Sequence, residues 1–177
     1  MKFLVCMMVL LSSALAWGQQ PAAAAPATGG LDSLAWMKGD WAGKQDFNTN
    51  GGEAMVGDAT DKIDTGIAGK YLCEMLSTTL PGRKPTDTRH FISWDAKASQ
   101  YTAWWFNDTS THPMELTGSL TENKLVLFSN PAAPGPVLRA TYEGTQDGKL
   151  TFLLEMKTGE NWTRLFLTTY TKRAAQP

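Results

Sequence analysis

Side chains alternate with a period of two along much of this chain, and that alternation restricts the fold more than any other feature of the sequence. From Trp41 to Phe47 every second residue is aromatic, glycine or an amide, whereas the alternate positions from Asp40 to Asp46 carry charges or alanine. Successive side chains of a strand point to opposite faces of a sheet, while a helix repeats about every 3.6 residues. The segment therefore predicts a strand with one solvated face and one buried face.

Turn signals divide the rest of the chain into short runs that are rich in Thr, Leu, Val and aromatic residues. Asn50-Gly51-Gly52, Pro81-Gly82 and Asp147-Gly148 are examples, and the last is the strongest hairpin signal. The segment Leu31 to Lys38, which precedes these runs, is predicted to be a short helix. The runs predict ten strands, at 40–49, 54–65, 70–80, 88–95, 100–107, 113–120, 124–129, 137–145, 149–157 and 161–172.

Ten short antiparallel strands need protection for the edges of their sheet, and closing the sheet into a barrel removes those edges altogether. Nearly every predicted connection is as short as a hairpin. We therefore expect an all-β fold: a ten-stranded antiparallel up-and-down β-barrel with a short N-terminal helix. A two-layer sandwich, which uses long crossing connections, is the alternative.

The start of the chain has the pattern of a secretory signal peptide over residues 1–18. A positive charge at Lys2 precedes an apolar run, and small residues then offer cleavage after Ala16 or Gly18. The apolar run is shorter than the roughly 20 residues that cross a bilayer. We therefore expect a secreted or periplasmic protein with no transmembrane segment after cleavage.

The composition after the signal peptide restricts the partners. Residues 19–30 are predicted to be a flexible Pro/Ala-rich linker, and 31–173 a single domain. Without Lys2, 15 of the 16 basic residues remain against 17 acidic residues, which argues against nucleic acid because its binding needs a basic face. Cys6 lies in the signal peptide, so Cys73 has no partner for an internal disulfide, and its apolar neighbours favour a small buried side chain.

Several motifs resemble known barrel families. Gly39-Asp40-Trp41 is similar to the Gly-x-Trp start of lipocalin-like and nitrobindin-like barrels. Ser93-Trp94-Asp95, the run Tyr101 to Asn107 and the ending Tyr170 to Arg173 resemble a bacterial lipocalin-like (calycin-like) family known only as a domain of unknown function. Ser93 replaces the usual Gly of that pattern and Asn107 the usual Asp. The resemblance implies the barrel fold and no established activity.

The resemblance also implies a role for the first-strand tryptophan. In such barrels this residue closes the narrow end, and a basic side chain from the last strand packs across its ring. Trp41 is the expected plug, with direct ligand contact as the alternative. Arg164, which shares its parity with Trp162 and Phe166, is the expected basic partner. Trp36, on the short helix, is expected to pack as a lid over the same end.

The richest stretch for binding is 101–114, "YTAWWFNDTSTHPM". Tyr101, Trp105 and Asn107 share one face of the predicted strand, and the family resemblance places Trp105 inward. An aromatic wall with a polar group at its rim suits a cavity for a small apolar or amphipathic ligand. With His90 these three residues are our candidate ligand lining. The alternative is that the rings only fill a dry core.

Cofactor and catalytic patterns are weak. A structural zinc needs four protein ligands and a catalytic zinc usually three, and two histidines on different strands do not predict such a set, so we expect no metal. Haem is disfavoured, because nitrobindin-like barrels supply a late histidine and no histidine follows His112. No Gly-x-Ser-x-Gly motif is present.

Three functions remain open at this point. The first is a carrier or sensor of a small molecule. The second is an isomerase or hydrolase that pairs His90 with a carboxylate such as Glu74. The third is a structural envelope protein whose barrel is filled with side chains and binds no ligand. We expect binding rather than catalysis, and the sequence does not indicate an oligomeric state.

Overall fold

The computed structural model describes residues 29–48, 55–108 and 110–174. The predicted signal peptide and most of the predicted linker lie outside the described residues. The elements are η1 (Leu31–Met37), β1 (Gly39–Phe47), β2 (Met55–Gly66), β3 (Tyr71–Thr79), β4 (Thr86–Asp95), β5 (Gln100–Asn107), β6 (Met114–Thr121), β7 (Lys124–Ser129), β8 (Leu138–Gly144), β9 (Leu150–Thr158) and β10 (Asn161–Lys172).

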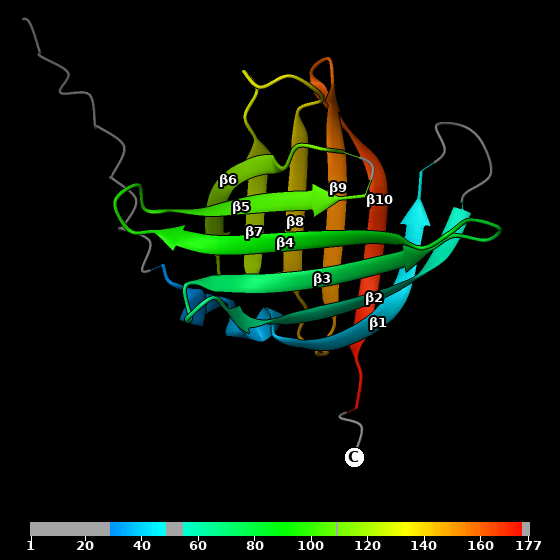
Figure 1. Ribbon diagram of the computed structural model, residues 1–177, viewed down its shortest axis with the longest axis horizontal. Coiled ribbons are helices and arrows are strands. Elements are labelled where there is room, and N and C mark those ends of the chain that lie inside the picture. Colours follow the sequence, from blue (N-terminus) through cyan, green and yellow to red (C-terminus); the bar gives the residue numbers. More distant parts are fainter. Residues whose placement is uncertain (1–28, 49–54, 109, 175–177) are drawn as a thin grey trace, which may run out of the picture.

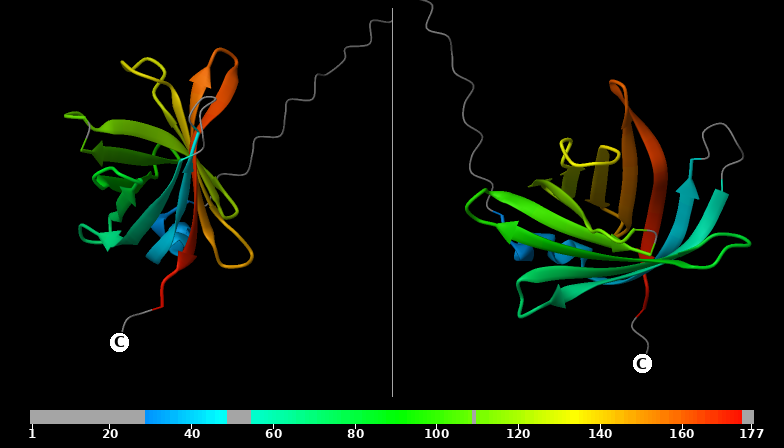
Figure 2. Two further views of the ribbon diagram at one scale, coloured as in Figure 1. Left: turned by 90° about the vertical axis from the view of Figure 1, so that its right-hand side faces the viewer. Right: turned by 45° about the horizontal axis from the view of Figure 1, so that its top comes forward.

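The ten strands form one closed antiparallel barrel in which each strand pairs with its neighbours in the chain. β1 pairs with β2 on one side and with β10 on the other, so the sheet has no free edge. Figures 1 and 2 show the strands wrapped around a common interior, with η1 near one end. The predicted ten-stranded up-and-down barrel with a short N-terminal helix is confirmed, and every strand boundary lies within two residues of its predicted place. Hairpin-forming turn residues fix these boundaries locally, which is why the sequence predicts them well.

The interior is filled by every second residue of the strands. In β2, for example, buried and exposed side chains alternate strictly from Gly57 to Asp64. Aromatic and branched apolar residues supply most of the core, which includes Leu34 and Met37 of η1. None of the helices in the described ranges is long and apolar enough to cross a membrane.

The two ends of the barrel differ in how well they are covered. Near η1, inward residues such as Ile63, Leu72 and Tyr170 are fully buried. At the opposite end, inward apolar residues such as Met114 and Phe166 are only partly buried. We therefore call the second end the open end.

Trp41 is held at the η1 end of the barrel. It is buried, and its indole N–H donates a hydrogen bond to the backbone carbonyl of Met37, 2.8 Å away. Trp36 of η1 is partly buried against the core, beside Gly144, where an added Cβ would come within 2.7 Å of the indole ring.

The prediction that Arg164 packs across the ring of Trp41 is wrong. A β-bulge lies between Arg164 and Phe166, so the parity that links them in the sequence is broken and Arg164 pairs across the sheet with Glu155. Arg164 is exposed on the outside, where its guanidinium lies 3.4 Å from Asp46. The cation over the Trp41 ring is Lys172, the cross-strand neighbour of Trp41, at 5.4 Å from the ring centroid.

Candidate functional site

Four inward side chains form one row across β3 to β6. The strand register pairs Glu74 with His90, His90 with Trp105, and Trp105 with Met114. The rings of His90 and Trp105 stack with centroids 4.3 Å apart. The row therefore runs from a carboxyl in the middle of the barrel to a thioether at the open end, with two stacked rings between them.

A tyrosine reaches this row from the opposite wall. The Tyr142 hydroxyl, on β8, donates a hydrogen bond to Glu74 Oε2 over 2.7 Å. His90 Nδ1 lies 2.6 Å from the same Glu74 oxygen and 2.9 Å from the Tyr142 hydroxyl. The three side chains are fully buried and bridge the interior of the barrel.

A second carboxyl, Asp61 on β2, lies next to Glu74 and is only 3% exposed. Burial, followed by the charge of the neighbouring Glu74, raises the pKa of Asp61 to about 10. Burial also raises the pKa of Glu74 to about 7, although its interactions with Asp61 and Tyr142 partly offset the rise. Because the pKa of Asp61 lies well above neutrality, this carboxyl keeps its proton at neutral pH.

The histidine of this cluster is neutral. Burial lowers the pKa of His90 to about 3. Because Glu74 is the ionisable acceptor between His90 and Tyr142, we assign the proton of the imidazole to Nδ1. Glu74 Oε2 then receives hydrogen bonds from His90 and Tyr142, and His90 Nε2 remains the basic nitrogen of the ring.

One buried donor in the row has no partner. The indole N–H of Trp105 makes no hydrogen bond to any described residue. Buried N–H groups are nearly always paired with protein or with a bound molecule. Trp105 therefore offers a free donor deep in the barrel, next to Met114.

The structure separates the four predicted lining residues. His90 and Trp105 are stacked in the middle of the barrel, and Asn107 is partly buried at the open end of β5. Tyr101 lies at the η1 end instead, where its hydroxyl donates to the Gly30 carbonyl over 3.0 Å and accepts from the Gly30 N–H over 3.3 Å. Alternate residues of one strand all face the interior, but β5 is long enough to place Tyr101 and Asn107 at opposite ends of the barrel.

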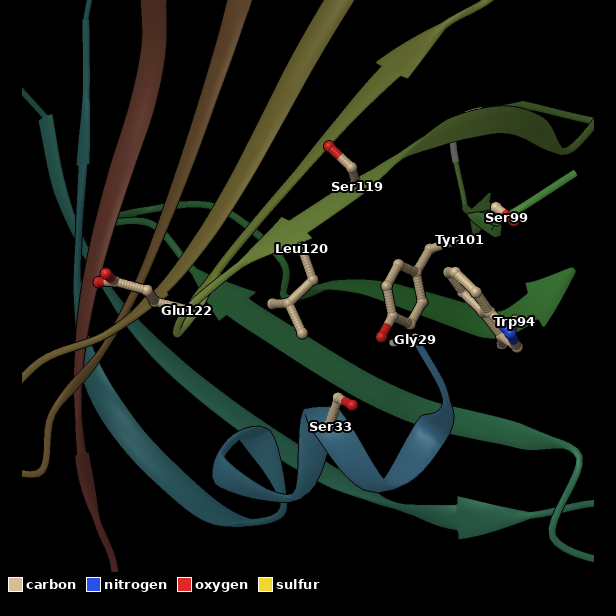
Figure 3. A pocket seen from close by; sticks show the side chains of 8 residues that line it. All are labelled: Gly29, Ser33, Trp94, Ser99, Tyr101, Ser119, Leu120 and Glu122. Atoms are coloured by element: carbon tan, nitrogen blue, oxygen red, sulfur yellow. The ribbon is translucent and has the colours of Figure 1, made fainter. Parts of the chain in front are cut away.

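Each end of the barrel carries a pocket. The pocket at the η1 end has a volume of about 280 Å³ and includes Tyr101, Trp94 and Glu122 in its wall. Figure 3 shows Tyr101 between Leu120 and Trp94, with Ser33 of η1 beside them. The pocket at the open end has a volume of about 620 Å³ and a wall that includes Met114, Ser129 and several prolines. The second pocket adjoins the row that contains Trp105.

Sequence reasoning missed two members of the buried cluster. Asp61 points inward, although Asp58 and Asp64, three residues away on either side, are exposed. Its parity with Ala59 and Ile63 was the signal that it faces the core. Tyr142 had no such signal, because its contact with Glu74 depends on which strands oppose each other across the barrel.

In the described part of the chain, no group of three or more His, Cys, Asp or Glu residues is arranged to hold a metal ion.

The fold and the buried cluster define a small, closed, ten-stranded antiparallel barrel with a helix at one end. The chain belongs to the DUF1579 family, described as proteins of unknown function, whose model matches residues 31–172. A search of curated proteins gives no significant match. Among solved structures, the crystal structure of Rv2717c from M. tuberculosis is similar to this chain, with a TM-score of 0.62 and 15% sequence identity over 81% of this chain and 97% of that protein. At that identity the likeness shows the fold alone.

Proposed function

We propose that the barrel binds a small amphipathic molecule in the pocket at its open end, and that the protein is an exported carrier or sensor of that molecule. The unpaired indole N–H of Trp105 carries this proposal, because a buried donor beside a pocket needs an acceptor. The signal-peptide pattern of the sequence supports export.

The pocket suits such a ligand in size and chemistry. Its volume of about 620 Å³ falls within the ~300–1,000 Å³ typical of small-molecule sites. Met114 and the prolines supply an apolar wall, and Met114 is the cross-strand neighbour of Trp105. An apolar body would lie against Met114 while an oxygen or nitrogen acceptor accepts the Trp105 N–H. His90 stacks behind Trp105 and fixes its ring.

Titration with the neutral fluorescent probe N-phenylnaphthylamine tests the pocket. We expect saturable binding, and we expect Met114→Arg to weaken it at least about tenfold, because a charge in an apolar wall costs 1.4 kcal/mol or more. The matched control, Ser119→Arg in the pocket at the η1 end, should leave probe affinity unchanged. Absence of binding, or equal effects of both variants, would contradict the proposal.

The mass of a co-purified ligand would help to identify it. Native mass spectrometry of the protein purified from its own host should show the chain with added mass, and Trp105→Phe, which removes the donor but keeps the ring, should reduce that fraction. A bare chain in every preparation, together with no probe binding, would favour a structural barrel without a ligand.

The contact between His90 and Glu74 favours a second function, an isomerase or hydrolase. A carboxylate that orients an imidazole through Nδ1 leaves Nε2 as a general base, and the 2.6 Å contact provides that arrangement. Neither side chain lines the two pockets described above, so a substrate would have to displace Trp105 or Tyr142. Turnover of a nitrophenyl ester panel that is lost in folded His90→Gln would support catalysis. Equal turnover in both proteins would rule it out.

A further inference from the structure

An aromatic surface covers the outer face of three neighbouring strands, β3, β4 and β5. We call it the β3–β5 patch. These strands cross the front of Figure 1, so their outer face points toward the reader. Phe106 and Met75 are 44% and 43% exposed. The patch consists of Tyr71, Cys73, Met75, Phe91, Trp104 and Phe106, all on the outward parity of their strands.

The rings of the patch contact one another rather than lying scattered. Ring centroids are 5.7 Å apart for Phe91 and Phe106, 6.1 Å for Tyr71 and Trp104, and 6.5 Å for Tyr71 and Phe91. The outer face of an antiparallel sheet is normally polar, and the adjacent strand β2 follows that rule with Thr60 and Lys62. A contiguous exposed apolar patch marks an interaction surface.

Charged residues at the borders of the patch fall into two rows of opposite sign. Cross-strand pairing places Lys62, Met75, Arg89 and Phe106 in one row, whose charges over β2 to β5 are basic, while Asp40 of β1 lies opposite Lys62 at its end. The next row contains Asp64, Cys73, Phe91, Trp104 and Glu115, so its charges are acidic. The two rows are adjacent and run across the same strands.

Four charged residues of these rows, Lys62, Asp64, Arg89 and Glu115, form no ion pair with another described residue. Ion pairs between described residues include Lys44 with Asp58 and Lys124 with Glu143, but none includes Lys62, Asp64, Arg89 or Glu115. Three of them make local hydrogen bonds: Glu115 accepts one from Trp104 Nε1, Arg89 donates one to the Thr88 carbonyl, and Asp64 accepts one from the Thr65 N–H. Opposite charges on this face therefore remain available to a partner.

We propose that the β3–β5 patch is the interface of a symmetric homodimer. In this dimer the two patches lie face to face, and the two-fold axis runs between them, parallel to the rows. Rotation about this axis places the basic row of one copy opposite the acidic row of the other. Lys62 then meets the partner subunit's Asp64, and Phe106 meets the partner subunit's Trp104. A partner with one sign of charge would be repelled by one of the two rows, whereas a second copy matches both.

A second aromatic pair on the outside of the barrel provides the control. Phe128 of β7 is 41% exposed and contacts Trp162 of β10, with ring centroids 5.9 Å apart. There the Arg139 guanidinium lies 4.6 Å above the Trp162 ring and also pairs with Glu155 at 2.6 Å. The Arg139 guanidinium is therefore already paired within the chain, so we do not expect Phe128 and Trp162 to drive association.

Sedimentation velocity of the purified chain over a wide range of concentration tests the interface. We expect a monomer–dimer equilibrium that Phe106→Arg weakens at least about 30-fold, the effect of losing an interface hot spot. Phe128→Ser should leave it unchanged. A monomer at all concentrations, or equal weakening by both variants, would overturn the proposal.

Charge reversal provides a test that surface damage would not mimic. Lys62→Asp alone and Asp64→Lys alone should each weaken the dimer, because each places like charges opposite each other across the two-fold axis. The double variant restores opposite charges and should recover much of the wild-type affinity. Additive weakening in the double variant would exclude the proposed register.

Discussion

Raising the pH from 6.5 to 10 should lower the free energy of unfolding of this barrel by on the order of 3–5 kcal/mol. The cause is Asp61, whose burial beside Glu74 raises its pKa from 3.8 to about 10. In the unfolded chain this carboxyl loses its proton near pH 4, while the folded chain keeps it. The folded state therefore binds more protons throughout the interval, and its stability falls as the pH rises.

The other buried ionisable groups determine the pH range in which the loss of stability due to Asp61 is clearest. Glu74, with its pKa raised from 4.5 to about 7, acts in the same direction as Asp61 but mostly below neutrality. His90 acts in the opposite direction, because its pKa falls from 6.5 to about 3 and the unfolded chain binds the extra proton between those values. Burial also raises the pKa values of Tyr142 and Tyr170, which keeps both hydroxyls protonated in the folded chain. Above pH 6.5 the histidine no longer offsets the acids.

Urea unfolding at a series of pH values and one protein concentration measures this effect. Asp61→Asn has no carboxyl proton to lose, so its stability should change much less above neutrality and exceed that of the wild type at alkaline pH. Asp58→Asn, on the exposed face of the same strand, should retain the wild-type slope. Parallel pH profiles for wild type and Asp61→Asn would show that Asp61 does not hold its proton.

The sequence predicted the barrel well because its strands and turns are specified locally. Hairpin turns such as Asp147-Gly148 set where each strand ends, and alternation sets which side chains face the core. Arg164 shows where this reasoning fails, because a bulge adds one residue to β10 and reverses the parity of everything beyond it. No residue type between Trp162 and Phe166 predicts that bulge.

The candidate site was less predictable than the fold. Trp105 and His90 could be assigned to one face, and their stacking follows from adjacent strands. The contact between Tyr142 and Glu74 crosses the barrel between residues 68 positions apart in the chain, and it depends on strand tilt and stagger. The same limit explains why Tyr101 could not be separated from Trp105 and Asn107 by parity alone.

Replacing Trp41 by alanine should lower the free energy of unfolding by about 3–5 kcal/mol, as expected for a buried tryptophan. The variant loses the ring, its hydrogen bond to Met37 and its contact with Lys172. It also removes the surface that holds η1 over the end of the barrel. Urea unfolding followed by circular dichroism measures the loss, and Trp162→Ala, which removes a partly buried tryptophan from the outer face, should cost less than about 2 kcal/mol.

A conservative variant separates the plug from direct ligand contact. Trp41→Phe keeps an aromatic ring but removes the indole N–H, so it should cost about 1 kcal/mol for the lost hydrogen bond to Met37. Because Trp41 lies at the η1 end and the proposed pocket lies at the open end, this variant should bind N-phenylnaphthylamine as tightly as the wild type. Weakened probe binding with unchanged stability would instead place the ligand against Trp41, at the closed end of the barrel.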